Sequence, residues 1–372
     1  MGSIQTDYSS LTPLPRVEVE GMHAYQAPLE NRRNLLRLDF NENTIGPSPL
    51  VIEALRNIPP NHISIYPEYN GLREAVVVNL NSAKLSSNLK TEQIGLFNGV
   101  DAAIHAIFNA YGDRGDKLVT TTPTFGYYTP CAQMQGMKIL AIPYEGTSYT
   151  FPIKKVEVAL LQQKPKLLLI CNPNNPTGTR LEPSKILKLA ASAPNTLVVV
   201  DELYEAFTGD SVLPLVDFTQ TPNLLVLRSL SKTAGLAGLR IGFAIGNSDV
   251  VDTISRVTGP YDINSFAVTA ALAALQDQAY VDAYVEAVLQ AKEWIKHQLH
   301  SSGRRHHIDG GNFLLLWPKH DTSKVETSLR EAGVLVRGMK SKSLIEGALR
   351  VSIGVTDQMK QFWNTFSKVD LI

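Results

Sequence analysis

Cysteine is scarce in this sequence, and neither sign of charge is in excess. The 372 residues include two cysteines, Cys131 and Cys171, and 35 basic residues balance 35 acidic residues. Because the two cysteines lack the spacing of metal ligands, they predict free thiols in a reducing compartment and no metal site. A net charge of zero argues against a polybasic surface, so we expect neither a nucleic-acid partner nor a membrane partner.

Long apolar runs are also missing. No uninterrupted apolar stretch is long enough to span a bilayer, and the sequence MGSIQTDYSSLTPLP at the N-terminus has no basic region followed by an apolar one. We therefore expect no transmembrane helix and no secretory signal, and a cytoplasmic location. The hydrophobic content of 44% and the charged content of 19% are ordinary for a soluble globular protein.

Helical and strand signals alternate from about residue 47 onward. Short apolar runs between helical segments are typical of strands that are buried on both faces, and the alternation predicts a mainly parallel sheet. The expected strands are 118–121, 166–171, 196–201, 223–229 and 240–246, and the expected helices are 49–58, 70–82, 100–111, 124–135 and 182–192.

The pattern changes near residue 264, where a smaller α+β domain is expected. Its predicted elements are the helices 264–276 and 280–301, the strands 312–317, 333–337 and 348–354, and a closing helix at 355–367. The fold class is therefore α/β with a second domain. We expect an N-terminal arm at 1–45 that joins the small domain, a large domain at 46–262, and the small domain at 263–372.

Ligands of open α/β sheets bind beyond the carboxyl ends of the strands, so the residues after each strand are of interest. The segment NGVDAAIHAIF follows residues 95–97. Asn98 can cap a helix there and Gly99 lets the backbone turn, so the helix N-terminus could bind a phosphate. A plain helix cap would explain this segment equally well.

Two further strand ends carry polar side chains. The turn NPNNPTGT (172–179) is rigid, and Asn175 could present its amide to a ligand, although a tight surface turn is the alternative. Asp201 stands where the next strand ends, and Tyr204 follows three residues later. Asp201 could cap a helix, or it could face a protonated ring nitrogen of a cofactor.

The segment SLSKTAGLAGLRIG (229–242) follows another strand. Lys232 stands among small residues that leave room for a bulky group, and Ser229, Ser231 and Arg240 can bind a phosphate. A lysine in a solvated loop is the alternative. The four strand ends together offer a lysine, an acid, an amide, a phenol and phosphate donors, which suits pyridoxal 5′-phosphate.

These motifs resemble those of the fold-type I aminotransferases, and most closely the histidinol-phosphate aminotransferase branch. The resemblance covers nearly the whole chain and implies a seven-stranded sheet with helices on both faces. The motifs are LDFNENTIGPSP (38–49), IYPEYNGLREA (65–75), NGVDAAI (98–104), TPTFGYY (122–128), NPNNPTGT (172–179), VVVDELY (198–204), SLSKTAGLAGLRIG (229–242) and LRVSIG (349–354).

The resemblance implies a role for each matching position. Lys232 forms the Schiff base with the cofactor and shuttles a proton, and Asp201 pairs with the pyridinium nitrogen. Asn175 and Tyr204 hydrogen-bond the phenolic oxygen of the cofactor, and Phe125 stacks on its ring. The phosphate is bound by Gly99, Val100, Asp101, Ser229, Ser231 and Arg240.

Four more positions concern the partner subunit and the substrate. Tyr66, in the IYP motif, is expected to reach the cofactor phosphate of a neighbouring subunit, which implies a homodimer. Arg350 is expected to bind the substrate α-carboxylate or its equivalent, because a planar guanidinium matches that group. Arg337, thirteen residues before Arg350, has the spacing of an arginine that binds the substrate phosphate, and Tyr25 in the N-terminal arm could approach the substrate. A solvated arginine at a strand end and an unrelated tyrosine are the alternatives.

The expected reaction is L-histidinol phosphate plus 2-oxoglutarate giving imidazole acetol phosphate plus L-glutamate, as a ping-pong exchange. Two segments near the substrate depart from the branch pattern: NENTIGP, where NENP and an aromatic residue are common, and SIYPE, where an arginine commonly precedes the tyrosine. An aminotransferase for aromatic or other amino acids, a decarboxylase of threonine-phosphate type, and a cofactor-binding protein without turnover therefore remain alternatives. We expect the pair His306-His307 to lie in a solvated surface turn.

Overall fold

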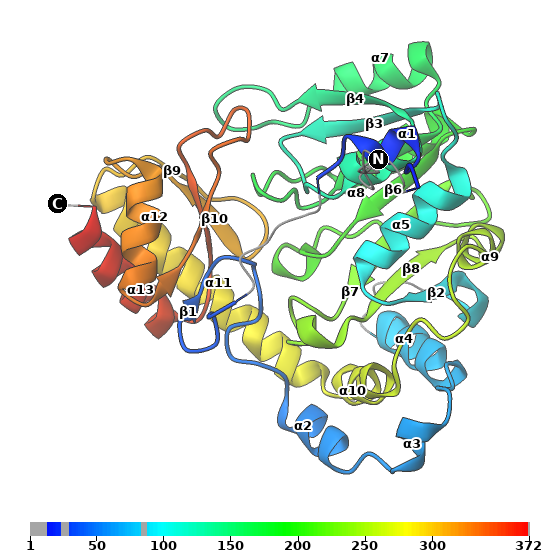
Figure 1. Cartoon of the computed structure of the whole chain (residues 1–372), viewed down its shortest axis with the longest axis horizontal. Coiled ribbons are helices and arrows are strands. Elements are labelled where there is room, and N and C mark those ends of the chain that lie inside the picture. The colour runs from blue at the N-terminus through cyan, green and yellow to red at the C-terminus, as the bar shows by residue number, and fades with distance from the viewer. Residues whose placement is uncertain (1–12, 24–29, 83–87, 371–372) are drawn as a thin grey trace, which may run out of the picture.

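The central sheet is the framework of the molecule (Figure 1). The computed structural model describes residues 13–23, 30–82 and 88–370. The seven strands of this sheet are ordered β2-β8-β7-β6-β5-β3-β4. They are β2 (Ile94–Phe97), β3 (Lys117–Thr122), β4 (Lys138–Pro143), β5 (Leu167–Cys171), β6 (Leu197–Asp201), β7 (Leu224–Ser229) and β8 (Gly242–Gly246).

The sheet is mainly parallel, as predicted. Only β8 runs antiparallel to its neighbours, β2 and β7, among the strands of this sheet. Every residue of β5 and β6 is buried. The register pairs Cys171 with Asp201 and Asp201 with Leu227, so the carboxyl ends of β5, β6 and β7 lie side by side. The loops that follow these strands therefore meet at one edge.

Both faces of the sheet are buried under helices, since alternate strand residues point to opposite faces and belong to two different core clusters. Val198 and Val200 of β6 pack in one core cluster, and Leu197 and Val199 pack in the other. The helices are α2 (Pro49–Arg56), α3 (Asn61–Ser64), α4 (Asn70–Ser82), α5 (Val100–Tyr111), α6 (Tyr128–Met134), α7 (Ile153–Gln163), α8 (Pro183–Ser192), α9 (Ser248–Ser255) and α10 (Ser265–Gln276). Short helical turns are α1 (Val17–Glu20), η2 (Thr91–Gln93), η3 (Glu205–Phe207) and η4 (Ala237–Leu239).

A second sheet lies beside the first, with the order β12-β13-β10-β9 and antiparallel pairing throughout. Its strands are β9 (His306–His307), β10 (Phe313–Leu316), β12 (Arg337–Gly338) and β13 (Leu349–Ser352). The helices α11 (Gln278–Ser301), α12 (Thr322–Glu331) and α13 (Thr356–Val369) contribute to a third core cluster with this sheet. Figure 1 shows the long helix α11 extending from beside α10 to this second sheet.

The N-terminal segment is tied to the smaller unit. Strand β1 (Leu36–Arg37) pairs in parallel with β11 (Val334–Leu335). The segment 333–337, predicted as one strand, is thus divided between β11, which pairs with β1, and β12, which pairs with β13. Among the described residues, no helix is both long and apolar enough to cross a bilayer.

The prediction that His306 and His307 lie in a solvated turn is wrong. They form strand β9, which pairs with Leu315 and Leu316 of β10, and both side chains are half-buried. The ring of His307 packs edge-on against Tyr149, with 4.7 Å between the ring centres. Burial lowers the pKa of His307 below its usual value.

Candidate active site

Lys232 lies in the loop between β7 and η4, at the edge where the parallel strands end. Its Nζ donates a hydrogen bond to the carbonyl of Phe40, 3.0 Å away, and lies 6.0 Å from the ring centre of Tyr204. Burial, followed by the positive charge of Arg350, lowers the pKa of Lys232 to about 8. A substantial fraction of this amine is therefore neutral near physiological pH, as a nucleophilic lysine requires.

Asp201 ends strand β6 and is almost fully buried. Its Oδ2 accepts a hydrogen bond of 2.6 Å from the hydroxyl of Tyr128, and its Oδ1 accepts one of 3.2 Å from the backbone of Leu203. Burial raises the pKa of Asp201 to about 6, although these hydrogen bonds lower it. Asp201 does not cap the following helical turn, because η3 begins at Glu205 and has no side-chain cap. A buried carboxylate whose hydrogen-bond donors are both neutral suits a cationic ligand such as a protonated ring nitrogen.

The hydroxyl of Tyr204 receives two amide donors. Nδ2 of Asn175 donates to it over 3.1 Å, and Nδ2 of Asn41 donates to it over 3.2 Å. Burial raises the pKa of Tyr204 above its usual value, so the phenol keeps its proton. With both amides donating, that proton is available to an acceptor in the site, such as a phenolic oxygen.

A candidate phosphate site is formed where the loop after β2 meets the loop before β8. Gly99 is the N-cap of α5 with a φ of 80°, and a Cβ there would lie 2.5 Å from Nη2 of Arg240. The prediction that Asn98 caps this helix is wrong, because Gly99 holds that position and no side chain caps it. A Cβ on Gly242 would lie 2.6 Å from the backbone nitrogen of Val100. The close approach of these backbones places free N–H groups and a guanidinium together, which suits an anion.

Two serines and an acid belong to the same region. Ser229 donates from its Oγ to the Oγ of Ser231 over 2.9 Å, and the Ser231 backbone donates back to Ser229. Asp101 lies in the first turn of α5, and its Oδ2 accepts a hydrogen bond of 2.9 Å from Arg240. Asp101 therefore orients the guanidinium, while Ser229 and Ser231 add hydroxyl donors.

Phe125 lies before α6 and not within it. The predicted helix 124–135 starts only at Tyr128, because Thr124 bonds the side chain of Asn174 and the carbonyl of Pro123 accepts from Asn174 instead. The Phe125 ring meets the Tyr128 ring edge-on, with 5.5 Å between the ring centres. Phe125 is thus adjacent to the residue that bonds Asp201.

Arg350 and Arg337 lie opposite each other on the neighbouring strands β13 and β12. Arg350 donates from Nη1 to Oδ1 of Asn175 over 2.7 Å, and from Nη2 to the carbonyl of Asp39 over 2.5 Å. The guanidinium carbon of Arg337 lies 5.8 Å from the ring centre of Phe40, whose carbonyl accepts from Lys232. The structure therefore brings both arginines to the Lys232 region and does not leave Arg337 at a remote strand end.

One predicted residue is not part of this cluster, and another cannot be placed. Tyr66 is exposed and stacks on Tyr261, with 3.9 Å between the ring centres and 14° between the ring planes. Tyr25 lies outside the residues that the structure describes. The groups of the cluster are therefore supplied by both sheets of one chain, and Tyr66 is exposed on its surface.

Three polar residues of the site were not predicted from the sequence. Tyr128 stands in the motif TPTFGYY and Asn41 in LDFNENTIGPSP, so both were inside quoted segments. Neither motif indicates that Tyr128 bonds Asp201 or that Asn41 bonds Tyr204. Lys342, whose Nζ comes within 3.4 Å of a Cβ built on Gly126, had no signal beyond its position between Arg337 and Arg350.

Across the described parts of the chain, no group of three or more histidine, cysteine, aspartate or glutamate side chains could hold a metal ion. The donor set of the site is instead that of an organic phosphate with a basic ring nitrogen. Adjoining loops offer the amine of Lys232, the carboxylate of Asp201, the phenol of Tyr204 and the guanidinium of Arg240. This set of groups fits pyridoxal 5′-phosphate.

The chain is similar to known aminotransferases. Residues 33–363 match the family model described as aminotransferase class I and II. The chain is 30% identical to a histidinol-phosphate aminotransferase of Caldanaerobacter subterraneus over 96% of this chain and 98% of that protein. It is 31% identical to a dihydroxyacetone phosphate transaminase of Campylobacter jejuni over 88% of each. The crystal structure of a histidinol-phosphate aminotransferase from Sinorhizobium meliloti in complex with pyridoxal-5′-phosphate covers 97% of this chain and aligns over 99% of its own, with a TM-score of 0.85 and 20% identity.

Proposed function

Because this chain belongs to the aminotransferase class I and II family, we propose that it transfers the amino group of L-histidinol phosphate to 2-oxoglutarate. The enzyme is a transaminase that depends on pyridoxal 5′-phosphate. The products of the proposed reaction are imidazole acetol phosphate and L-glutamate, and the reaction belongs to histidine biosynthesis.

The pair of arginines on β12 and β13 is the observation that supports this substrate. Arg337 and Arg350 are opposite residues on neighbouring strands, and both approach the segment Asp39–Phe40 that borders Lys232. Within the described residues, no acidic side chain forms an ion pair with Arg337. Two guanidinium groups at one end of a site suit a phosphate ester in one half-reaction and a carboxylate of glutamate in the other.

The cofactor would be held by the residues described above. Asp201 would stabilise the protonated ring nitrogen, Asn175 and Tyr204 would hydrogen-bond the phenolic oxygen, and Phe125 would cover the ring. Gly99, Val100, Asp101, Ser229, Ser231 and Arg240 would form the phosphate site. When bound, pyridoxal 5′-phosphate supplies an electron sink that stabilises negative charge on the substrate α-carbon.

Lys232 would hold the aldehyde of the cofactor and move the proton. Its lowered pKa leaves the amine able to accept a proton from the substrate α-carbon and to return it. Asp201 would remain ionised beside a bound cation, because the opposite charge offsets the cost of burying the carboxylate. Arg350 would orient the substrate so that the α-proton faces Lys232.

The named relatives also indicate the chemistry of the substrate. Both relatives compared above have names that contain a phosphate-bearing substrate, histidinol phosphate in one and dihydroxyacetone phosphate in the other. Dihydroxyacetone phosphate is therefore the second candidate, as an amino acceptor in place of imidazole acetol phosphate. Arg337 and Arg350 would bind the substrate phosphate of either compound, at a site separate from that of the cofactor phosphate.

A substrate panel tests the proposal. Initial rates would be measured with 2-oxoglutarate and each of L-histidinol phosphate, L-histidinol, L-phenylalanine and threonine phosphate, with release of carbon dioxide followed in parallel. We expect the highest kcat/KM for L-histidinol phosphate and no carbon dioxide. A higher kcat/KM for phenylalanine would assign an aromatic amino donor, and carbon dioxide from threonine phosphate would assign a decarboxylase.

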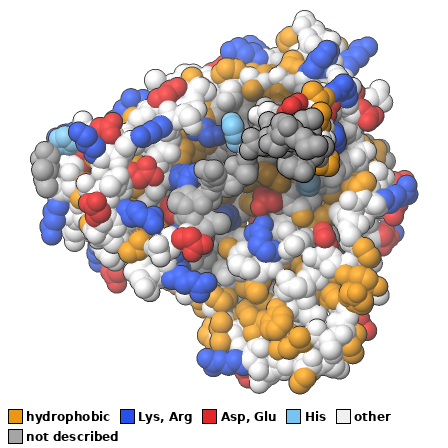
Figure 2. Space-filling model, in the orientation of Figure 1, with side chains coloured by type: hydrophobic (Ala, Val, Ile, Leu, Met, Phe, Trp, Pro, Cys, Tyr) orange, Lys and Arg blue, Asp and Glu red, His pale blue; other side chains and the backbone are white. Residues whose placement is uncertain are grey.

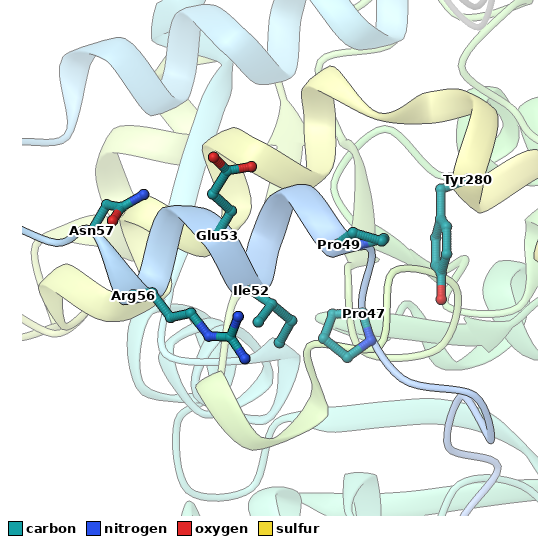
Figure 3. A pocket seen from close by; sticks show the side chains of 7 residues that line it. All are labelled: Pro47, Pro49, Ile52, Glu53, Arg56, Asn57 and Tyr280. Atoms are coloured by element: carbon teal, nitrogen blue, oxygen red, sulfur yellow. The ribbon is translucent and has the colours of Figure 1, made fainter.

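We further propose that the chain forms a homodimer through the surface around α2 and α3. Ile45, Leu50, Ile63, Ile65 and Tyr66 are exposed in this segment. Figure 2 shows hydrophobic side chains gathered on the part of the surface where Figure 1 places α2 and α3. A groove of about 600 Å³ lies along α2 in the same region, lined by Pro47, Pro49, Ile52, Glu53, Arg56, Asn57 and Tyr280 (Figure 3). An exposed apolar surface of this kind is typical of a subunit interface, and Tyr66 would then reach the cofactor phosphate of the neighbouring subunit.

The expected division of the chain is also retained as a proposal. It consists of an arm at 1–45 that joins the small domain, a large cofactor-binding domain at 46–262 and a small domain at 263–372. The pairing of β1 with β11 supports the assignment of the arm to the small domain. We propose a cytoplasmic location, in which the buried thiols of Cys131 and Cys171 would stay reduced.

A further inference from the structure

We propose that Lys342 binds the phosphate group of the amino donor together with Arg337 and Arg350, and thereby selects phosphate-bearing substrates. This inference rests on the proposed function, since it adds a third cation to the same substrate site. Nothing in the sequence pattern singles out Lys342, which lies in the loop between β12 and β13.

The position of Lys342 places its amine at the border between the two sheet units. Its Nζ would lie 3.4 Å from a Cβ built on Gly126, the residue after Phe125. Burial is the largest cause that lowers the pKa of Lys342, and the positive charges of Arg350 and Arg337 lower it further. The half-buried amine therefore lies beside the Phe125 loop and within the electrostatic influence of the two arginines of β12 and β13.

Lys342 and Arg337 differ from a neighbouring arginine in having no acidic partner among the residues that the structure describes. Arg32 of the same region is matched by Asp39 and Glu42, at 2.7 Å each. By contrast, neither Lys342 nor Arg337 forms an ion pair with any acidic side chain in the described residues. Like charges that are brought together and partly buried destabilise one another, so the cluster favours an anion between them.

The loop that carries Lys342 is held in place at three points. The hydroxyl of Tyr149 donates to the carbonyl of Leu344 over 3.4 Å, and Nε1 of Trp317 donates to the carbonyl of Glu346 over 3.0 Å. Thr322 donates to the carbonyl of Gly347 over 2.7 Å. The contact with Tyr149 crosses from the loop to the large sheet unit, so the position of Lys342 is fixed relative to both sides of the site.

The number of cations distinguishes a phosphate ester from a carboxylate. A phosphate monoester carries a charge of about −1.5 to −2 at pH 7 and has three acceptor oxygens. The side-chain carboxylate of glutamate carries one charge and has two oxygens. Two arginines suffice for the carboxylate, whereas the third oxygen and the second charge of the phosphate require a further donor, and Lys342 is placed to supply it.

The first experiment compares Lys342→Gln with the wild-type holoenzyme on L-histidinol phosphate and on L-histidinol. Lys340→Gln is the matched control, because Lys340 is an exposed lysine of the same loop. Loss of one charge-assisted hydrogen bond is expected to raise the KM for L-histidinol phosphate about tenfold or more, with little change in kcat. The kcat/KM for L-histidinol should not change, Lys340→Gln should behave as wild type, and Lys342→Arg should restore most of the affinity.

A binding measurement without turnover provides the second readout. Enzyme loaded with pyridoxamine 5′-phosphate cannot react with an amino donor, so calorimetry with L-histidinol phosphate measures binding alone. The dissociation constant should rise by the same factor in Lys342→Gln. Equal losses for L-histidinol and L-histidinol phosphate, or a KM for the phosphate ester within twofold of wild type, would overturn the proposal.

Inhibition by inorganic phosphate tests the role of Lys342 independently of which amino donor the enzyme uses. It is expected to inhibit the half-reaction of glutamate in the wild-type holoenzyme, and about tenfold more weakly in Lys342→Gln. If the wild-type enzyme does not prefer L-histidinol phosphate but this difference in inhibition is found, the assigned substrate is wrong and the phosphate role of Lys342 stands. If inorganic phosphate inhibits both proteins equally, the role of Lys342 is refuted whichever donor is used.

Discussion

The hydroxyl of Tyr128 donates a hydrogen bond of 2.6 Å to Oδ2 of Asp201, and both side chains are buried. The two residues are 73 positions apart in the sequence, on α6 and at the end of β6. The hydrogen bond orients Asp201 and lowers its pKa. Since Asp201 is proposed to pair with a protonated ring nitrogen, Tyr128 would be a positioning residue that acts on the cofactor through Asp201.

Replacement of Tyr128 by Phe removes this hydrogen bond and keeps the ring. The hydrogen bond lowers the pKa of Asp201, which is about 6, so its loss should raise that pKa by about one unit. Because only the ionised carboxylate would pair with a protonated ring nitrogen, the acid limb of the pH profile of cofactor binding to the apoenzyme should move to higher pH, with about fivefold weaker binding near pH 6. Tyr127→Phe is the control. An unchanged acid limb in Tyr128→Phe would contradict the role of Tyr128.

Attachment of the cofactor to apoenzyme should depend on the ionisation of Lys232. Only the neutral amine adds to an aldehyde, so the rate should rise with pH and level off above a pKa of about 8. Removal of a nearby positive charge in Arg350→Gln should raise that pKa and move the inflection to higher pH. Stopped-flow absorbance measures this rate. An inflection near the usual lysine pKa in the wild-type protein would show that Lys232 is not desolvated.

Replacement of Gly99 by Ala should damage the phosphate site as well as the fold. Gly99 has a φ of 80°, and the added Cβ would collide with Arg240 at 2.5 Å. Gly115→Ala is the control for a positive φ, because its φ is 89° but no atom lies within 4 Å of the added Cβ. We expect both variants to lose about 1–2 kcal/mol of stability from the backbone, and only Gly99→Ala to bind the cofactor more weakly, by about tenfold or more. Thermal denaturation measures the loss of stability, and cofactor titration measures the loss of affinity. Equal cofactor affinity in both variants would contradict a phosphate site at Gly99 and Arg240.

A charge placed in the exposed apolar segment should separate the proposed dimer. Ile65→Asp introduces a carboxylate beside Tyr66, whereas Leu161→Asp places one on an exposed leucine of α7 as a control. Light scattering after size exclusion should give a monomer for Ile65→Asp and a dimer for Leu161→Asp and the wild type.

A mixture of Tyr66→Ala and Lys232→Ala subunits should recover activity. In a mixed dimer, one active site has Lys232 from the first subunit and Tyr66 from the second, so that site is complete. A wild-type monomer would refute the dimer, and a mixture without recovery would refute the role of Tyr66 across subunits.

The framework of the fold could be predicted from the sequence, because it depends on local patterns. The apolar runs at 196–201 and 223–229 became β6 (Leu197–Asp201) and β7 (Leu224–Ser229). Since parallel strands end at a common edge, the residues after them could be expected to meet, and the loops that carry Lys232, Asp201 and Asn175 do so. The antiparallel direction of β8 had no local signal.

The contacts that complete the site could not be predicted, because they join residues far apart in the sequence. Asn41 and Tyr204 are 163 positions apart, and Arg350 and Asn175 are 175 positions apart. The sequence 124–135 was expected to be helical throughout, yet Thr124 is held by a tertiary hydrogen bond to Asn174 that no local propensity describes. Likewise, the short strand His306–His307 is stabilised by pairing with β10 and not by its own composition.

A single-turnover measurement with L-histidinol phosphate tests the central claim most directly. Loaded wild-type enzyme and Lys232→Ala enzyme would each be mixed with the donor in the absence of any oxo acid, and the yellow absorbance of the bound cofactor would be followed by stopped flow. We expect rapid loss of this absorbance in the wild type, far faster than with L-phenylalanine, and no comparable reaction in Lys232→Ala. Loss at the wild-type rate in Lys232→Ala would contradict the mechanism, and a wild-type enzyme that reacts with phenylalanine but not with L-histidinol phosphate would contradict the assigned substrate.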